Sequence, residues 1–242
     1  MSWPDRPAIH EVNAWVWVHD WSHRIAATLD LGSMPAEAWD EVCRPGVDAV
    51  WLMGVWERSP AGVEIGRSDP NLDAAHHQAL PDFAPEDVAG SPYCVRRYEV
   101  DAALGGRAAL ARAREELARR NCALVLDFVP NHVAPDHPWT AEHPDVFVTG
   151  TAGDLADHPD AYLRVGDHVL ARGRDPYFPP WPDVVQLDAF SPGLRRAATE
   201  TLVDITGQCD GVRCDMAMLL MNDVFGRTWG GEPPSEDYWP QV

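Results

Sequence analysis

The sequence predicts an α/β fold with a parallel sheet, and three observations support that class. Short apolar runs alternate along the chain with longer segments that carry apolar residues at helical spacing. The run that begins at Leu124 stays apolar until Asp127, as is typical of a parallel strand that is buried on both faces. Polar residues gather where such runs end, which is where α/β barrels keep their chemistry.

Four strands are expected. The run that begins at Leu124 and residues 211–214 have the pattern of short strands, and residues 9–17 and 47–53 resemble the first two strands of the family named below. Between the second and third strands, residues 56–104 indicate a long polar loop that is rich in proline, aspartate and histidine.

Three helices are expected between these strands. The first covers residues 35–43, because Pro35 suits a helix start and Pro45-Gly46 ends it. The second covers residues 107–120 and has one apolar face. That face consists of Leu110, Ala113 and Leu117. The third begins at Ser191, with Pro192 in its first position.

Residues 134–190 look like an inserted subdomain. Prolines are frequent there and are interspersed with Tyr177, Phe178 and Trp181, which favours ordered loops with few regular elements. The expected division is residues 1–133 with strands one to three, residues 134–190, and residues 191–242 with helix three, strand four and a truncated segment. In that last segment, Ser235 is expected to cap a helix.

A cation and a carboxylate stand two residues apart in the fourth strand. Side chains alternate along a strand, so Arg213 and Asp215 share one face. The guanidinium is expected to keep the carboxylate ionised, and an ionised carboxylate at a strand end can attack an electrophilic carbon. A structural ion pair is the alternative, because such pairs also stabilise folds.

A second motif, Asp127-x-x-x-Asn131-His132, precedes Gly211-x-Arg213-x-Asp215. Together, in this order and on separate strands, the two motifs resemble the α-amylase family, glycoside hydrolase family 13. The resemblance implies the first half of a TIM (β/α)₈ barrel, about four βα units, with a small inserted subdomain after strand three. The family's barrel has eight strands and the sequence supplies four.

The resemblance also implies roles for individual residues. Asp215 would be the catalytic nucleophile and Arg213 its orienting cation. The substrate-binding group would be His132, Tyr93 and Asp127. In it, His132 donates a hydrogen bond to a sugar hydroxyl and Asp127 is a buried acid that fixes the guanidinium. Tyr93 would stack on a pyranose ring, with core packing as the alternative. The family's general acid is a glutamate after strand five, beyond residue 242.

No cofactor is expected. Asn131 is often a calcium ligand in the resembled family, but the family's aspartate is replaced here by Gln186. Calcium prefers several anionic oxygens, so bound calcium is not expected, and Asn131 would be a metal ligand only if calcium were bound.

Charge and cysteine content restrict the partners and the compartment. The chain has 19 basic and 38 acidic residues, for a net charge of −19, which disfavours nucleic acid. No apolar run is long enough to span a membrane, and the N-terminus lacks the pattern of a signal peptide. The five cysteines have no metal-ligand spacing, which favours a reducing, cytoplasmic location.

The expected function is therefore that of a partial catalytic domain of a retaining α-glucosidic-bond enzyme, either hydrolase or transglycosylase. Its substrate would be an α-glucan or α-glucoside, and its partner the missing barrel half, in cis or in trans. The chain by itself is expected to be inactive. The alternative is a non-catalytic sugar-binding or assembly module derived from such a barrel.

Overall fold

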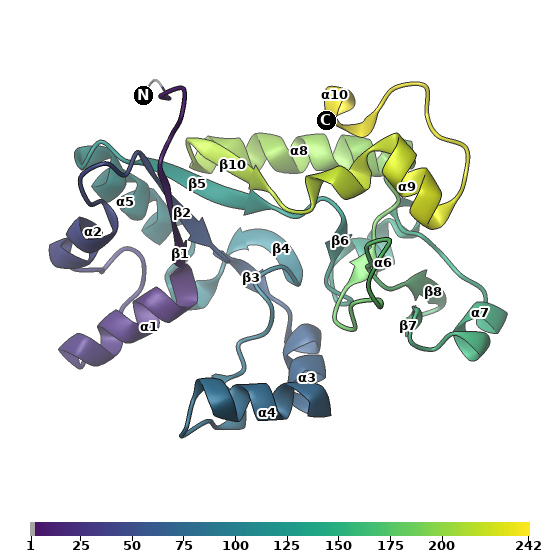
Figure 1. Ribbon diagram of the computed structural model, residues 1–242, viewed down its shortest axis with the longest axis horizontal. Helices are drawn as coiled ribbons and strands as arrows, with labels where there is room; N and C mark the ends of the chain where they lie inside the picture. Colours follow the sequence, from purple (N-terminus) through teal and green to yellow (C-terminus); the bar gives the residue numbers. More distant parts are fainter. Residues whose placement is uncertain (1–2) are drawn as a thin grey trace. The chain divides into compact units, whose positions relative to one another are not determined.

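The computed structural model describes residues 3–242 and divides the chain into two compact units. The first unit comprises Met1–Glu57, Tyr98–Phe128 and Glu200–Asp215. The second comprises Arg58–Arg97, Val129–Thr199 and Met216–Val242. Figure 1 shows the helices and strands with the labels used below. The predicted domain boundaries at residues 133 and 190 stay a prediction.

A four-stranded parallel sheet forms the centre of the first unit (Figure 1). Its strands are β1 (Ile9–Asn13), β2 (Ala49–Met53), β5 (Ala123–Phe128) and β10 (Gly211–Cys214). Their order in the sheet, β1-β2-β5-β10, is their order in the sequence. This confirms the predicted α/β class with four parallel strands.

The two faces of this sheet differ in composition. One face carries Val50 and Leu52 of β2 and Leu124 and Leu126 of β5, all with no exposed area. On the opposite face, Ala49, Ala123 and Val125 form a small cluster against Trp51. Asp127 follows Val125 at period two, so the polar strand end belongs to this second face.

The first strand is shorter than predicted. It ends at Asn13, and helix α1 (Ala14–Ile25) takes the rest of the predicted strand, residues 14–17. The side chain of Asn13 accepts a hydrogen bond from Val16 N at 3.3 Å, which caps the helix. Ala14, Trp17 and Val18 are buried at helical spacing, so the apolar residues read as a strand form a helix face.

Two of the predicted helices are confirmed in the first unit. Helix α2 covers Ala36–Val42 after Pro35, and α5 covers Gly106–Arg119. The buried face of α5 includes the predicted Leu110, Ala113 and Leu117. The third, α8 (Pro192–Gln208), begins where predicted.

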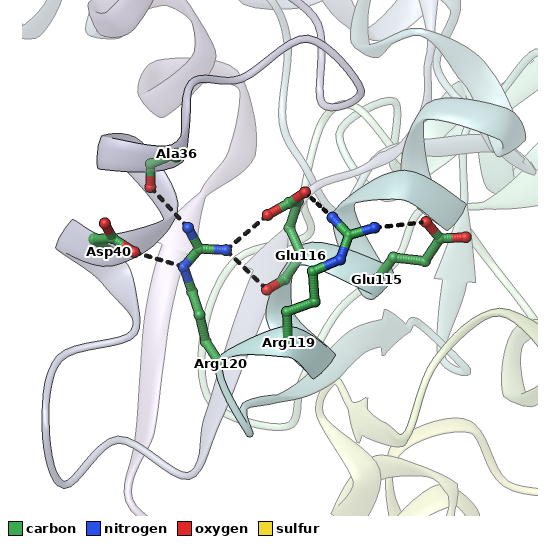
Figure 2. Close-up of polar contacts among 6 residues, drawn as sticks. All are labelled: Ala36, Asp40, Glu115, Glu116, Arg119 and Arg120. Atoms are coloured by element: carbon green, nitrogen blue, oxygen red, sulfur yellow. Dashed lines mark hydrogen bonds and ion pairs between the residues drawn. The ribbon is translucent and has the colours of Figure 1, made fainter.

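Arg120 joins α2 to α5 (Figure 2). Its Nε donates to Asp40 Oδ1 at 2.7 Å, and its Nη2 donates to the carbonyl of Ala36 at 3.1 Å. Its Nη1 donates to the carboxylate and the carbonyl of Glu116, at 2.7 and 3.0 Å. Among the described residues, the neighbouring Arg119 pairs with Glu115 and Glu116 of its own helix. Arg120 therefore fixes the contact between two helices, whereas Arg119 does not.

The polar loop predicted over residues 56–104 is wrong, because this stretch is largely regular. It holds β3 (Trp56–Arg58), α3 (Pro60–Ser68), α4 (Pro70–Ala79), η1 (Pro85–Asp87), β4 (Val95–Val100) and η2 (Ala102–Leu104). Helix α3 begins with a side-chain cap, since Ser59 Oγ accepts from Gly62 N at 2.8 Å and Pro60 occupies the first turn. The frequent proline, aspartate and histidine residues of this stretch favoured a loop in the sequence.

Short elements make up the regular part of residues 132–190. They are β6 (His132–Val133), α6 (Trp139–Glu142), η3 (Pro144–Val146), α7 (Ala152–Asp157), β7 (Tyr162–Val165), β8 (His168–Ala171) and β9 (Val185–Gln186). β6 pairs antiparallel with β9, and β7 with β8. Irregular backbone joins them.

After β10 the chain forms η4 (Ala217–Leu220), α9 (Asn222–Trp229) and α10 (Tyr238–Gln241). The predicted Ser235 cap is wrong. Asp237 caps α10 instead, and its Oδ1 accepts from Tyr238 N at 2.7 Å and from Asn222 N at 3.1 Å. Across the described residues, no helix is both long and apolar enough to cross a membrane.

Candidate active site at the carboxyl ends of β5 and β10

One guanidinium nitrogen faces two carboxylates at adjoining strand ends. Arg213 Nη1 lies 2.6 Å from Asp215 Oδ1 and 3.4 Å from Asp127 Oδ1. The side chains of Asp127 and Asp215 are only 2% and 7% exposed, whereas that of Arg213 is 34% exposed. The structure thus brings together the predicted nucleophile, its predicted orienting cation and the predicted buried acid.

Strand register produces this arrangement. In the parallel pair, Arg213 stands opposite Asp127, and Cys214 stands opposite Phe128. Asp215 follows directly, and its backbone N–H donates to the carbonyl of Phe128 at 2.8 Å, which extends the pairing by one residue. Since side chains alternate, Arg213 and Asp215 project to one face of the sheet.

Asp127 is held by residues that follow the neighbouring strand β2. The backbone N–H of Gly54 donates to Asp127 Oδ2 at 3.2 Å, and Trp56 Nε1 donates to the carbonyl of Asp127 at 2.8 Å. Gly54 has a φ of 78°, a conformation that side-chain-bearing residues rarely adopt. A turn that only glycine enters easily therefore aims an N–H at the carboxylate.

Trp51 supports the guanidinium from the same strand. The centre of the Arg213 guanidinium lies 4.7 Å from the centroid of the Trp51 ring, within the range of a cation–π contact. Sequence reasoning missed Gly54, Trp51 and Trp56. The available signal was their place within and just after the second strand, beside the strand that carries Asp127.

Burial raises the pKa of Asp127 to about 6, because desolvation disfavours the charged carboxylate. The Trp51 side chain, the Gly54 N–H and the Arg213 guanidinium oppose this rise, and the negative charge of Asp215 adds to it. Asp127 therefore changes its charge in a range where exposed aspartates are fully ionised.

Burial also raises the pKa of Asp215 above its ordinary value, and the charge and hydrogen bond of Arg213 limit that rise. The sequence predicted that the guanidinium keeps this carboxylate ionised. In the structure, desolvation is the larger influence, because Asp215 is almost fully buried.

His132 and Tyr93 lie in the second unit and approach each other there. His132 is 5% exposed, and its burial lowers the pKa to about 4, against a smaller opposing effect of the Tyr93 backbone. The imidazole is therefore neutral at pH 7 and has one N–H to donate. Its ring centroid lies 5.1 Å from that of Trp181. The Tyr93 side chain is half-buried.

The side-chain amides of Asn131 and Gln186 are hydrogen-bonded to each other. Gln186 Nε2 donates to Asn131 Oδ1 at 3.0 Å and to the carbonyls of Asn131 and Leu187, at 2.9 and 3.0 Å. The two carbonyls fix the orientation of the amide, so an N–H group faces the Asn131 oxygen. These two side chains offer calcium no carboxylate oxygen, and the expectation that no calcium is bound stays a prediction. Among the described residues, no group of three or more histidines, cysteines, aspartates or glutamates could hold a metal.

No family model matches the chain. Among curated proteins, α-amylase MalA from Haloarcula japonica is 26% identical over 180 residues, which cover 74% of this chain and 21% of MalA. The chain thus spans about a fifth of that relative.

Solved structures share the fold over most of the chain. An α-amylase from Lactobacillus plantarum aligns with 92% of this chain and 41% of its own, at 22% identity and a TM-score of 0.59. An isomaltulose synthase mutant from Erwinia rhapontici NX5, in complex with D-glucose, aligns with 89% of this chain and 35% of its own, at 16% identity and a TM-score of 0.58. Matched in sequence and in fold by α-amylases, the chain is related to the α-amylase family, glycoside hydrolase family 13.

Proposed function

We propose that the chain is part of the catalytic domain of a retaining enzyme that acts on α-glucosidic bonds. One observation carries this proposal: Arg213 Nη1 contacts both Asp215 and Asp127 at the carboxyl ends of neighbouring parallel strands. Barrel enzymes place their reacting groups at that edge. The substrate would be an α-glucan or α-glucoside, which agrees with the α-amylases among its relatives.

Asp215 would act as the nucleophile. Its carboxylate oxygen attacks the anomeric carbon, the glycosidic C–O bond breaks, and the departing oxygen takes a proton from a general acid. Water or a sugar hydroxyl then attacks the same carbon, loses its proton to that residue, and frees Asp215. Hydrolysis and transglycosylation share this covalent intermediate, so both belong to the proposal.

Arg213 and Asp127 would prepare the nucleophile. The hydrogen bond from Arg213 favours the ionised form of Asp215, against the burial that disfavours it. Asp127 would hold the guanidinium from its other side, while the Gly54 N–H holds Asp127. His132 would donate a hydrogen bond to a sugar hydroxyl, and Tyr93 would face the apolar side of a pyranose.

No residue of the sequence is assigned as the general acid. The resemblance assigns that role to a glutamate on a further strand, which the rest of the barrel would supply, in cis or in trans. We also propose a cytoplasmic location, because all five cysteines are free and three of them are buried.

Replacing Asp215 by Asn tests the proposal in the completed barrel, which is this chain together with the rest of its barrel, in cis or in trans. The amide has nearly the same shape but is not a nucleophile, so turnover of a maltooligosaccharide should fall by several powers of ten, with folding retained. Asp223→Asn is the matched control, because that side chain is 68% exposed on α9. Undiminished turnover by Asp215→Asn would reject the proposed nucleophile. No turnover by the parent would favour the sugar-binding or assembly module.

A further inference from the structure

Two neighbouring aromatic side chains project from the second unit into solvent. Tyr177 is 87% exposed and Phe178 is 70% exposed, more than any other large apolar side chain in the described part of the chain. They stand in the sequence from Pro176 to Trp181, which contains no charged residue although the whole chain carries a net charge of −19. Core packing within the described residues does not account for this uncharged, exposed aromatic pair.

The backbone below these rings is held in place. Asp175 is buried, and its Oδ1 accepts from Tyr177 N at 2.6 Å and from Phe178 N at 3.0 Å. Trp181 N donates to the carbonyl of Gly173 at 2.8 Å, which closes the loop. The loop thus presents its two rings from a fixed turn, so that little conformational entropy is lost when a ligand binds.

A second anchor comes from Arg174 of the same loop. Its Nη2 donates to the carbonyl of Thr228 at 2.9 Å, and its guanidinium lies 4.3 Å from the ring centroid of Trp229. Both partners belong to the end of α9, so the loop is attached to a helix as well as to its own base.

The base of the loop contacts the residues around His132. Trp181 meets the His132 ring edge-on, and Arg174 N donates to Gln186 Oε1 at 3.4 Å. A Cβ placed on Gly173 would lie 2.8 Å from a Val184 methyl and 3.3 Å from the Cβ of His132, so no side chain larger than hydrogen fits there without a shift. The exposed rings and the proposed sugar ligand His132 therefore belong to one packed structure.

We propose that Tyr177 and Phe178 form a stacking platform for the glucosyl rings of an α-glucan. The proposal rests on the proposed function and adds a binding site to it. Aromatic faces suit the apolar side of a pyranose, and the absence of charge at the loop tip suits a neutral ligand. The attachment to the His132 region favours a glucan over a protein partner, because one chain of sugars could contact both.

Binding of the 242-residue chain to amylose tests the platform. In native gels that contain amylose, the parent should be retarded. The dissociation constant obtained from this retardation should rise at least tenfold when Tyr177→Ala and Phe178→Ala are combined. Tyr177→Phe keeps the ring and should retain binding. Val203→Ala, at a position that is 68% exposed on α8, is the control for loss of an exposed apolar side chain.

Each result decides for or against the platform. Unchanged retardation of the double variant, or a parent that amylose does not retard, would overturn it. Sedimentation of the parent as a dimer that the double variant abolishes would show a protein contact instead, and would also overturn it. Turnover of the completed barrel separates the two proposals. If the double variant loses amylose binding while Asp215→Asn keeps full turnover, only the nucleophile is rejected. If the double variant binds amylose like the parent while turnover depends on Asp215, only the platform is rejected.

Discussion

Arg213 and Asp127 occupy paired positions on two neighbouring parallel strands, and Arg213 Nη1 lies 3.4 Å from Asp127 Oδ1. The same nitrogen lies 2.6 Å from Asp215 Oδ1. One cation thus serves two carboxylates that are nearly inaccessible to water, and this arrangement determines the expected behaviour of all three residues.

Replacing Arg213 by Met should lower the free energy of unfolding at pH 7 by roughly 2–4 kcal/mol, because two buried carboxyl groups lose their shared cation. Arg227→Met is the control, since Arg227 is 73% exposed and pairs with an exposed Asp223. That change should cost about 0–1 kcal/mol. Urea denaturation of both variants measures the difference, and equal losses would argue against a buried network.

The pKa of Asp127 predicts a pH dependence of stability. In the folded chain it is raised from 3.8 to about 6, so the folded state binds this proton more tightly than the unfolded state. The resulting stabilisation is fully present below pH 3.8 and is lost as the pH rises through about 6.

Asp127→Asn removes this titration. Between pH 4 and pH 7, the unfolding free energy of the parent should fall by up to about 3 kcal/mol more than that of the variant, since one pKa unit corresponds to about 1.4 kcal/mol. Urea denaturation at several pH values checks this. Parallel pH profiles for parent and variant would mean that Asp127 has an ordinary pKa.

The contact between α2 and α5 should depend on Arg120 and not on Arg119. Arg120→Met removes hydrogen bonds to two carbonyls and two carboxylates, from a side chain that is 18% exposed, and should destabilise the fold by roughly 1–3 kcal/mol. Arg119 is 62% exposed, so Arg119→Met should cost less than about 0.5 kcal/mol. Thermal unfolding of the two variants provides the comparison, and a larger shift for Arg119→Met would contradict it.

The sequence predicted the parallel strands well where apolar runs are bounded by turn residues. The fourth strand, residues 211–214, has the predicted bounds, and the period-two spacing of Arg213 and Asp215 gave their shared face. Prediction failed where a side chain changed the local preference. Asn13 caps a helix inside the expected first strand, and Asp237 rather than Ser235 caps the last helix.

Other features depend on contacts that no local pattern reveals. Helices α3 and α4 are only nine and ten residues long and each begins at a proline, which favoured a loop in the sequence. The hydrogen bond from Gly54 N to Asp127 joins residues that are 73 positions apart, and the pairing of β2 with β5 brings them together. The balance between burial and Arg213 at Asp215 likewise requires the folded structure.

The 242-residue chain alone should not turn over glucosides at a useful rate. Without an acid to protonate the leaving oxygen, the reaction loses about 10² to 10⁴-fold. Release of reducing sugar from maltoheptaose by the purified chain measures this. Steady turnover that Asp215→Asn abolishes would show that a residue of this chain serves as the acid.

The central claim is that Asp215 forms a bond to the sugar. A 2-deoxy-2-fluoro- or 5-fluoroglycosyl fluoride slows release of the intermediate, so incubation with the completed barrel should leave one fluoroglycosyl group on the enzyme. Peptide mass spectrometry should place that group on Asp215 in the parent and find none in Asp215→Asn. Labelling of another carboxylate, or equal labelling of the variant, would contradict the account.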